Sequence, residues 1–171
     1  MKKKLLILAL ITALILTISI SVAAETAKNG GWLVTAGEDP LTDEFTLYIY
    51  SQYSEKDQYN VIGLRRKEGK TNLILQTDYL GNDHLKDLIY RFDQEELVET
   101  KWGIASSSSS LFFKEDQDTL KSFVKKMMEH DELIFGYWPY EESRKTVVYS
   151  LNGFAASITP YLDELGWADL K

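Results

Sequence analysis

Apolar and polar residues alternate along most of the chain from Trp32 onward. Between residues 45 and 50, Phe, Leu and Ile alternate with Thr and Tyr, which is the two-residue period of a strand with one buried face. Similar runs at 61–64 and 73–75 flank the Gly-containing segment 67–70 and predict a hairpin. Further strands are predicted at Trp32–Thr35, Leu88–Phe92, Trp102–Ser106, Leu111–Phe113, Leu133–Trp138 and Thr146–Ser150. Because most of these segments leave no room for a helix between them, we expect an antiparallel sheet.

One segment follows a helical period instead. Between residues 116 and 129 the apolar positions have the spacing of a helix that lies on a core. These positions are Leu120, Phe123, Val124, Met127 and Met128. Asp116 or Asp118 is expected to cap the N-terminus of this helix.

A second apolar stripe of helical spacing runs from Phe154 to Leu165. Pro160 lies inside it and should kink the helix or restart it, with Thr159 as the cap. Together the patterns predict a mainly β (α+β) fold, an antiparallel β-sandwich or barrel-like domain covered by two short helices. No internal repeat or linker divides residues 25–171, so we expect a single domain there, with Trp102 and the helix residues Phe123 and Met127 in its core.

Residues 1–24 have the three parts of a secretory signal peptide. The lysines Lys2–Lys4 precede an apolar run from Leu5 to Ile20, and small residues follow at Ser21–Ala24. We expect cleavage near Ala23–Ala24 and export to the periplasm or the extracellular space, with no membrane span afterwards. An uncleaved anchor is the alternative, but the apolar run is shorter than the ~20 residues that span a bilayer. No cysteine follows the run, which excludes a bacterial lipoprotein.

Charge and composition exclude several classes of function. The formal charge is −7 and the isoelectric point is about 4.9, which argues against nucleic acid as a partner. The chain has no cysteine, so disulfides, thiol catalysis and cysteine-based metal sites are excluded. His84 and His130 are the only imidazoles, and we expect neither a metal site nor a cofactor.

Several features that can carry chemistry also have a plainer structural interpretation. The serine run Ser106–Ser110 has no histidine near it in sequence and indicates a polar turn. His84 is expected in a solvated loop, and His130 is expected to cap the helix that precedes it. The aromatic segment Tyr137–Tyr140 can form a ligand platform, although an edge strand that turns at Pro139 is the preferred interpretation. The acidic pairs are expected on a solvated face, and they are Asp39 with Asp43, Glu95 with Glu96 and Glu141 with Glu142.

Charged residues inside predicted strands stand out. Arg65, Arg91 and Asp93 lie between apolar neighbours, and a charge that is buried there must be paired. We therefore expect Asp43, Arg65, Arg91 and Asp93 to form structural ion pairs, with Arg91 paired to Asp43 or Asp93. Strand alternation would place Arg91 and Asp93 on the same face. The alternative is that Arg91 points into a ligand groove.

These residues belong to an ordered set of short motifs that extends from Trp32 to Trp167. In chain order the motifs are Gly31-Trp32, Pro40-Leu41-Thr42-Asp43, Leu64-Arg65, Lys70-Thr71, Tyr90-Arg91-Phe92-Asp93, Trp102, Pro139-Tyr140, Thr146 to Ser150, Leu151-Asn152-Gly153 and Gly166-Trp167. The order and spacing resemble the VasI-like (TagO-like) family of type VI secretion-associated proteins. The resemblance implies an exported bacterial protein, and it implies neither an enzymatic activity nor a cofactor.

The chain departs from that family at two cysteines. The family usually has a cysteine directly after the arginine at position 65 and another just before the closing Gly-Trp. Arg66 and approximately Leu165 occupy these places here. Loss of both together is expected if the two cysteines form a disulfide in the relatives.

The first functional hypothesis is an exported, non-catalytic accessory or binding domain of an envelope- or secretion-linked assembly, with a protein partner in the cell envelope. One rival is a small exported hydrolase or carbohydrate-active protein that uses two carboxylates facing one cleft. Another is a secreted inhibitor or immunity-type binder, marked by an exposed aromatic patch around Trp138. The sequence assigns no catalytic residue.

Overall fold

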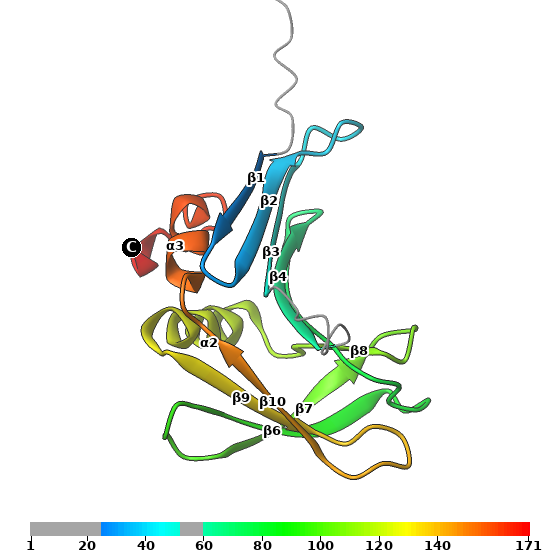
Figure 1. Cartoon of the computed structure of the whole chain (residues 1–171). Helices are drawn as coiled ribbons and strands as arrows, with labels where there is room; N and C mark the ends of the chain where they lie inside the picture. The colour runs from blue at the N-terminus through cyan, green and yellow to red at the C-terminus, as the bar shows by residue number, and fades with distance from the viewer. Residues whose placement is uncertain (1–24, 52–59) are drawn as a thin grey trace, which may run out of the picture.

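The computed structural model describes residues 25–51 and 60–171, and within them the chain is mainly β. Ten strands form one antiparallel sheet in the order β1-β2-β3-β4-β5-β8-β7-β6-β9-β10 (Figure 1). The predicted antiparallel, mainly β fold with two short helices is therefore confirmed. The sheet is not closed into a barrel, because β1 and β10 stand at opposite ends of the strand order.

The strand bounds are β1 (Glu25–Asn29), β2 (Trp32–Glu38), β3 (Phe45–Ser51), β4 (Val61–Lys67), β5 (Lys70–Gln76), β6 (Leu85–Phe92), β7 (Val98–Ile104), β8 (Ser110–Phe112), β9 (Glu132–Tyr137) and β10 (Lys145–Ser150). Every strand predicted from the sequence is present, including the β4–β5 hairpin. Strand β1 was not predicted, because its sequence Glu-Thr-Ala-Lys-Asn does not alternate between apolar and polar residues.

The helices are α2 (Gln117–Glu129), α3 (Phe154–Ile158) and the 3₁₀ turns η1 (Thr159–Tyr161) and η2 (Ala168–Leu170). Of the two proposed caps of α2, Asp116 is the one used, and its carboxylate accepts a hydrogen bond from the Thr119 amide at 2.8 Å. Pro160 restarts the chain as η1, as predicted. Thr159 is not the N-cap of this turn, because Ile158 is. The Thr159 hydroxyl donates back to the Ala155 carbonyl of the preceding helix.

The sheet bends so that β1–β4 and the layer of β6, β7, β9 and β10 lie on either side of α2 (Figure 1). Helix α2 buries its apolar stripe between them. The Phe123 ring lies 5.1 Å from that of Tyr90, 5.2 Å from that of Phe92 and 6.2 Å from that of Trp102. Trp102, Phe123 and Met127 are all buried, which confirms the predicted core.

The aromatic segment after β9 differs from its prediction. Strand β9 is an internal strand, paired with β6 on one side and β10 on the other, so it is not the expected edge strand. It ends at Tyr137, before Pro139. The sequence did not reveal this, because the partner β6 lies far from β9 along the chain and a local pattern does not show which strands pair.

Two glycine turns cross where the end of β10 meets the β1–β2 hairpin. Gly30 has φ +57°, and a Cβ added to it would lie 2.6 Å from the carbonyl oxygen of Asn152. Gly153 has φ +89°, and a Cβ added to it would lie still closer to the carbonyl oxygen of Asn29. Only glycine fits both the backbone conformation and the lack of space at these positions.

Trp32 fixes the same junction from inside. Its indole Nε1 donates to the Ser150 carbonyl at 3.2 Å, and its ring lies 4.7 Å from that of Phe154 at the start of α3. The two ends of the strand order are thus held near each other by packing and one side-chain hydrogen bond.

No helix in residues 25–51 or 60–171 has the length and apolar character needed to cross a membrane. The predicted signal peptide, residues 1–24, lies outside the described residues.

We expect Gly153→Ala to lower the free energy of unfolding more than Gly166→Ala does. Both glycines have positive φ, but no atom lies within 4 Å of a Cβ at Gly166. Gly166→Ala should cost about 1 kcal/mol from the backbone conformation alone. Gly153→Ala should cost about 1–3 kcal/mol more, because its methyl group overlaps the Asn29 carbonyl. Urea unfolding of both variants measures the difference, and equal losses would show that the crossing is not tightly packed.

Candidate functional site

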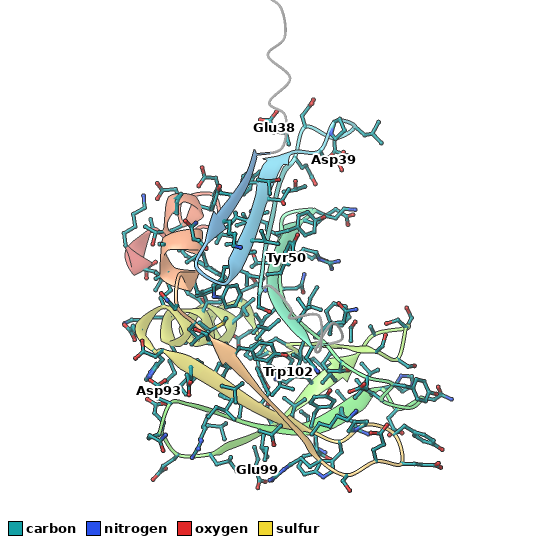
Figure 2. All side chains as sticks on the ribbon, viewed as in Figure 1. Glu38, Asp39, Tyr50, Asp93, Glu99 and Trp102 are labelled. Carbon is teal, nitrogen blue, oxygen red and sulfur yellow. The ribbon has the colours of Figure 1, made fainter. Side chains whose placement is uncertain are left out.

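The layer of β7, β6, β9 and β10 has a buried side and an exposed side. Strand pleating turns Phe92 and Trp102 into the core, whereas Ile89 and Arg91 point to the opposite side. Figure 2 shows the two sides, with Trp102 in the interior and Glu99 beyond the strands on the far side. We call this exposed side the outer face.

A groove of about 180 Å³ crosses the outer face. It contains two arginines between apolar walls and, within the described residues, no carboxylate lines it. Its lining residues are Ile89, Arg91, Leu97, Ile134, Gly136, Arg144 and Thr146. We call it the arginine groove.

Strand register builds the groove from three strands. Ile89 of β6 pairs with Gly136 of β9, and Arg91 pairs with Ile134 beside it. Gly136 pairs on its other side with Thr146 of β10. A Cβ at Gly136 would lie 2.8 Å from Cγ1 of Ile89 and 3.3 Å from Cδ of Arg144. The bare backbone at Gly136 therefore leaves room for the stem of Arg144 to lie across the strand.

Both arginines of the groove lack a carboxylate partner among the described residues. None of the ion pairs among the described residues involves Arg91 or Arg144. The chain has four arginines in total, so two of them line one groove of a protein whose formal charge is −7. The groove is a local concentration of positive charge on an acidic molecule.

A second hollow adjoins the arginine groove and shares Ile89 with it. We call it the tryptophan hollow, and its lining residues are Asp87, Leu88, Ile89, Glu99, Thr100, Lys101 and Trp138. Lys101 Nζ pairs with Asp87 Oδ1 at 2.6 Å inside it. The hollow thus has one aromatic wall and an ion pair, next to the unpaired arginines.

Apolar side chains are exposed around both cavities. Leu97 is 55% exposed, Val148 is 54% exposed and Trp138 is 36% exposed. Val148 pairs with Ile134, so its side chain is on the outer face as well. Exposed apolar and aromatic groups that surround arginines are typical of protein interfaces.

A polar cluster holds the base of the loop that carries Trp138 and Arg144. The Asp78 carboxylate lies 2.8 Å from the Tyr137 hydroxyl and 3.0 Å from Lys145 Nζ, so it ties the two ends of the loop together. Burial tends to raise the pKa of Asp78, but the hydrogen bonds from Lys145 and Tyr137 outweigh it and lower that pKa. The charged carboxylate is therefore the stable form at neutral pH.

The four predicted ion-pair residues are not brought together. Asp93 pairs with His130 rather than Arg91, and its Oδ2 lies 2.9 Å from His130 Nδ1. Its Oδ1 accepts from the Glu132 amide at 2.8 Å. Strand β6 ends at Phe92 and Asp93 has φ +45°, so the alternation that would have put Asp93 beside Arg91 stops one residue earlier.

Asp43 and Arg65 lie on the other part of the sheet. Asp43 is exposed in the turn before β3, where its amide donates to the Asp39 carbonyl. Arg65 lies on β4 between Tyr48 and Asn72 and is half-buried. Its Nε is buried without a hydrogen-bond partner among the described residues, and no described ion pair includes it.

The other candidates fall mostly where the sequence placed them. Ser106–Ser110 forms the turn between β7 and β8 and enters β8, and His84 is exposed just before β6. His130 is the C-cap of α2, and its amide donates to the Lys126 carbonyl. The aromatic segment does not form one platform. Tyr137 points inward and Trp138 lines the tryptophan hollow. The ring centroid of Tyr140 lies 5.7 Å from that of Tyr79.

Among the acidic pairs, Glu95 is held by two basic side chains. Glu95 is engaged by Lys126 at 2.6 Å and by His130 at 3.4 Å. No group of three or more metal-ligating side chains occurs in the part of the chain that the structure describes. Asp87 and Glu99 do share the tryptophan hollow, but both are exposed and Asp87 is paired with Lys101.

Comparison with known proteins identifies a fold and no family. No family model matches the chain, and no curated protein matches it either, so the resemblance to the VasI-like family is not confirmed. Among solved structures, the chain is similar to the crystal structure of invasion associated protein B from Bartonella henselae. The identity is 14% and the TM-score is 0.57, over 84% of this chain and 99% of that one. The two chains therefore share the fold.

We expect Arg91→Gln to leave the free energy of unfolding within about 0.5 kcal/mol of the wild type, because Arg91 forms no ion pair among the described residues. Asp93→Asn should lower the melting temperature, because it weakens the bonds to His130 and Glu132. These bonds lower the pKa of Asp93, so their contribution is present above its ordinary value of about 3.9 and is lost as pH falls through the lowered value.

Thermal unfolding of both variants from neutral to acidic pH tests this assignment. The gap between wild type and Asp93→Asn should close at low pH, whereas the curve for Arg91→Gln should follow the wild type throughout. A loss of about 3–5 kcal/mol for Arg91→Gln would instead show a buried ion pair.

Proposed function

We propose that this protein is an exported, non-catalytic accessory domain that binds a protein partner through the outer face. The observation that carries the proposal is the composition of that face. It combines an exposed tryptophan, exposed aliphatic side chains and two arginines that form no ion pair among the described residues. A solvent-exposed apolar surface next to unpaired charge is unfavourable to leave uncovered, and such surfaces in soluble proteins commonly serve binding.

The fold likeness is in keeping with an accessory role. One solved protein of similar fold is described as invasion associated. An envelope location also agrees with the signal-like residues 1–24 of this chain. A link to type VI secretion rests on the motif resemblance alone.

A second candidate, a carbohydrate-active protein, is favoured by one observation. Asp87, Glu99 and Trp138 line the same hollow, and two carboxylates beside an aromatic ring suit a sugar. Acid catalysis at neutral pH needs one carboxyl group in an apolar environment that raises its pKa. Asp87 and Glu99 are both exposed, and the ammonium group of Lys101 neutralises Asp87. Binding therefore fits the hollow better than hydrolysis does.

Site-specific photo-crosslinking in the producing cells tests the proposed function. We expect a photoreactive residue at Leu97 or Val148 to give one discrete protein adduct. The same residue at Leu41, which is 92% exposed on the β2–β3 loop, should not give that adduct.

The captured protein must then bind the purified domain. Leu97→Asp should weaken that binding by at least about tenfold, because it puts a charge into an apolar contact, and Leu41→Asp should have no effect. Adducts of equal yield from all three positions, or none from the outer face, would contradict the proposal.

Processing is a separate prediction. Mass spectrometry of the exported protein is expected to find an N-terminus at Ala24 or Glu25, because small residues end the apolar run there. An intact Met1 in the membrane fraction would favour the anchor instead.

A further inference from the structure

We propose that the arginine groove receives a carboxylate side chain from an extended, acidic segment of the partner protein. This inference rests on the proposed function and specifies the chemistry of the partner. The groove has two guanidinium groups, apolar walls and no acidic lining residue among those described. A carboxylate is an anion that a guanidinium group can bind through two hydrogen bonds.

The choice of arginine supports a carboxylate ligand. A guanidinium group is planar and presents paired N–H donors that match the two oxygens of a carboxylate. Arg144 lies across the bare backbone of Gly136, and Arg91 lines the same groove from the neighbouring strand. Since neither forms an ion pair among the described residues, binding an external carboxylate breaks none of the described ion pairs.

The surroundings favour a peptide over an anionic membrane. Asp87, Glu99 and Glu132 also project from this layer and would repel a continuous anionic surface. The positive charge is confined to one groove, whereas membrane binding requires a broad cluster of basic residues. A single acidic side chain that enters the arginine groove meets no acidic lining residue among those described.

The tryptophan hollow adds a second requirement. Side chains on one face of an extended peptide recur at every second residue, roughly 6–7 Å apart. The two cavities share Ile89 as a common wall. A peptide with an acidic residue in the arginine groove can therefore place the residue two positions away against Trp138, and that residue should be apolar.

Fluorescence anisotropy with a defined probe tests this inference. The probe is a fluorescein-labelled peptide of repeated Glu-Ser-Leu-Ser units, and the matched control replaces each Glu by Gln. We expect the full-length mature protein to bind the acidic probe, with an affinity that falls as salt rises, and to bind the Gln peptide at least about tenfold more weakly.

Variants distinguish binding at the arginine groove from non-specific attraction to positive charge. Arg91→Gln and Arg144→Gln should each weaken binding of the acidic probe by about tenfold or more, and Arg91→Lys should restore part of the loss. Lys70→Gln removes the same charge from an exposed position in the β4–β5 hairpin and should change nothing. Gly136→Ala should weaken binding as well, because its methyl group displaces Arg144 and Ile89.

The outcomes distinguish this inference from the proposed function. No binding of the acidic probe, equal binding of the Gln peptide, or binding unchanged in Arg91→Gln and Arg144→Gln would overturn the inference. Arginine-dependent binding to phosphatidylglycerol vesicles without binding to the peptide would overturn it too. If crosslinks at Leu97 and Val148 persist in these cases, the protein-binding function stands and only the acidic ligand is wrong.

Discussion

The crossing of the turns at Gly30 and Gly153 is the contact on which the rest of the structure depends. It brings the end of the last strand against the hairpin formed by the first two, in a sheet that is not closed by hydrogen bonds. Trp32 reinforces it by bonding to Ser150 and packing on Phe154. Because the chain has no cysteine, this close packing holds the junction without a disulfide. With the two ends fixed, α2 is enclosed between the two parts of the sheet.

The sequence was sufficient for the elements and insufficient for their arrangement. The alternation of apolar and polar residues over 45–50 and the apolar stripe from Leu120 to Met127 both reflect burial of one face. Burial of one face produces a periodic sequence pattern within each element. Pairing of β6 with β9 joins segments far apart in the chain, so no local pattern reveals it. The bend of the sheet and the internal position of β9 follow from that pairing, and only the structure shows them.

For the candidate site too, the sequence indicated some of the residues and not the others. Arg91 stood out because a charge interrupts an apolar strand, and the ligand-groove alternative for it now has a groove to support it. The preferred pairing with Asp93 assumed that the strand continued, but the backbone turns at that residue. Arg144 carried no signal, since an arginine in a polar loop is ordinary. Gly136 did carry one, because a glycine inside an apolar strand often marks a place of close approach.

The pleat of β6 separates two kinds of evolutionary constraint within a few residues. Phe92 is held by the aromatic core, whereas its neighbour Arg91 is half-buried on the outer face and forms no described ion pair. Substitutions on the outer face can therefore accumulate without loss of the folded state, while the residues between them stay fixed. A lineage that keeps this scaffold can vary the proposed binding surface one side chain at a time, and sequence divergence should be greatest there.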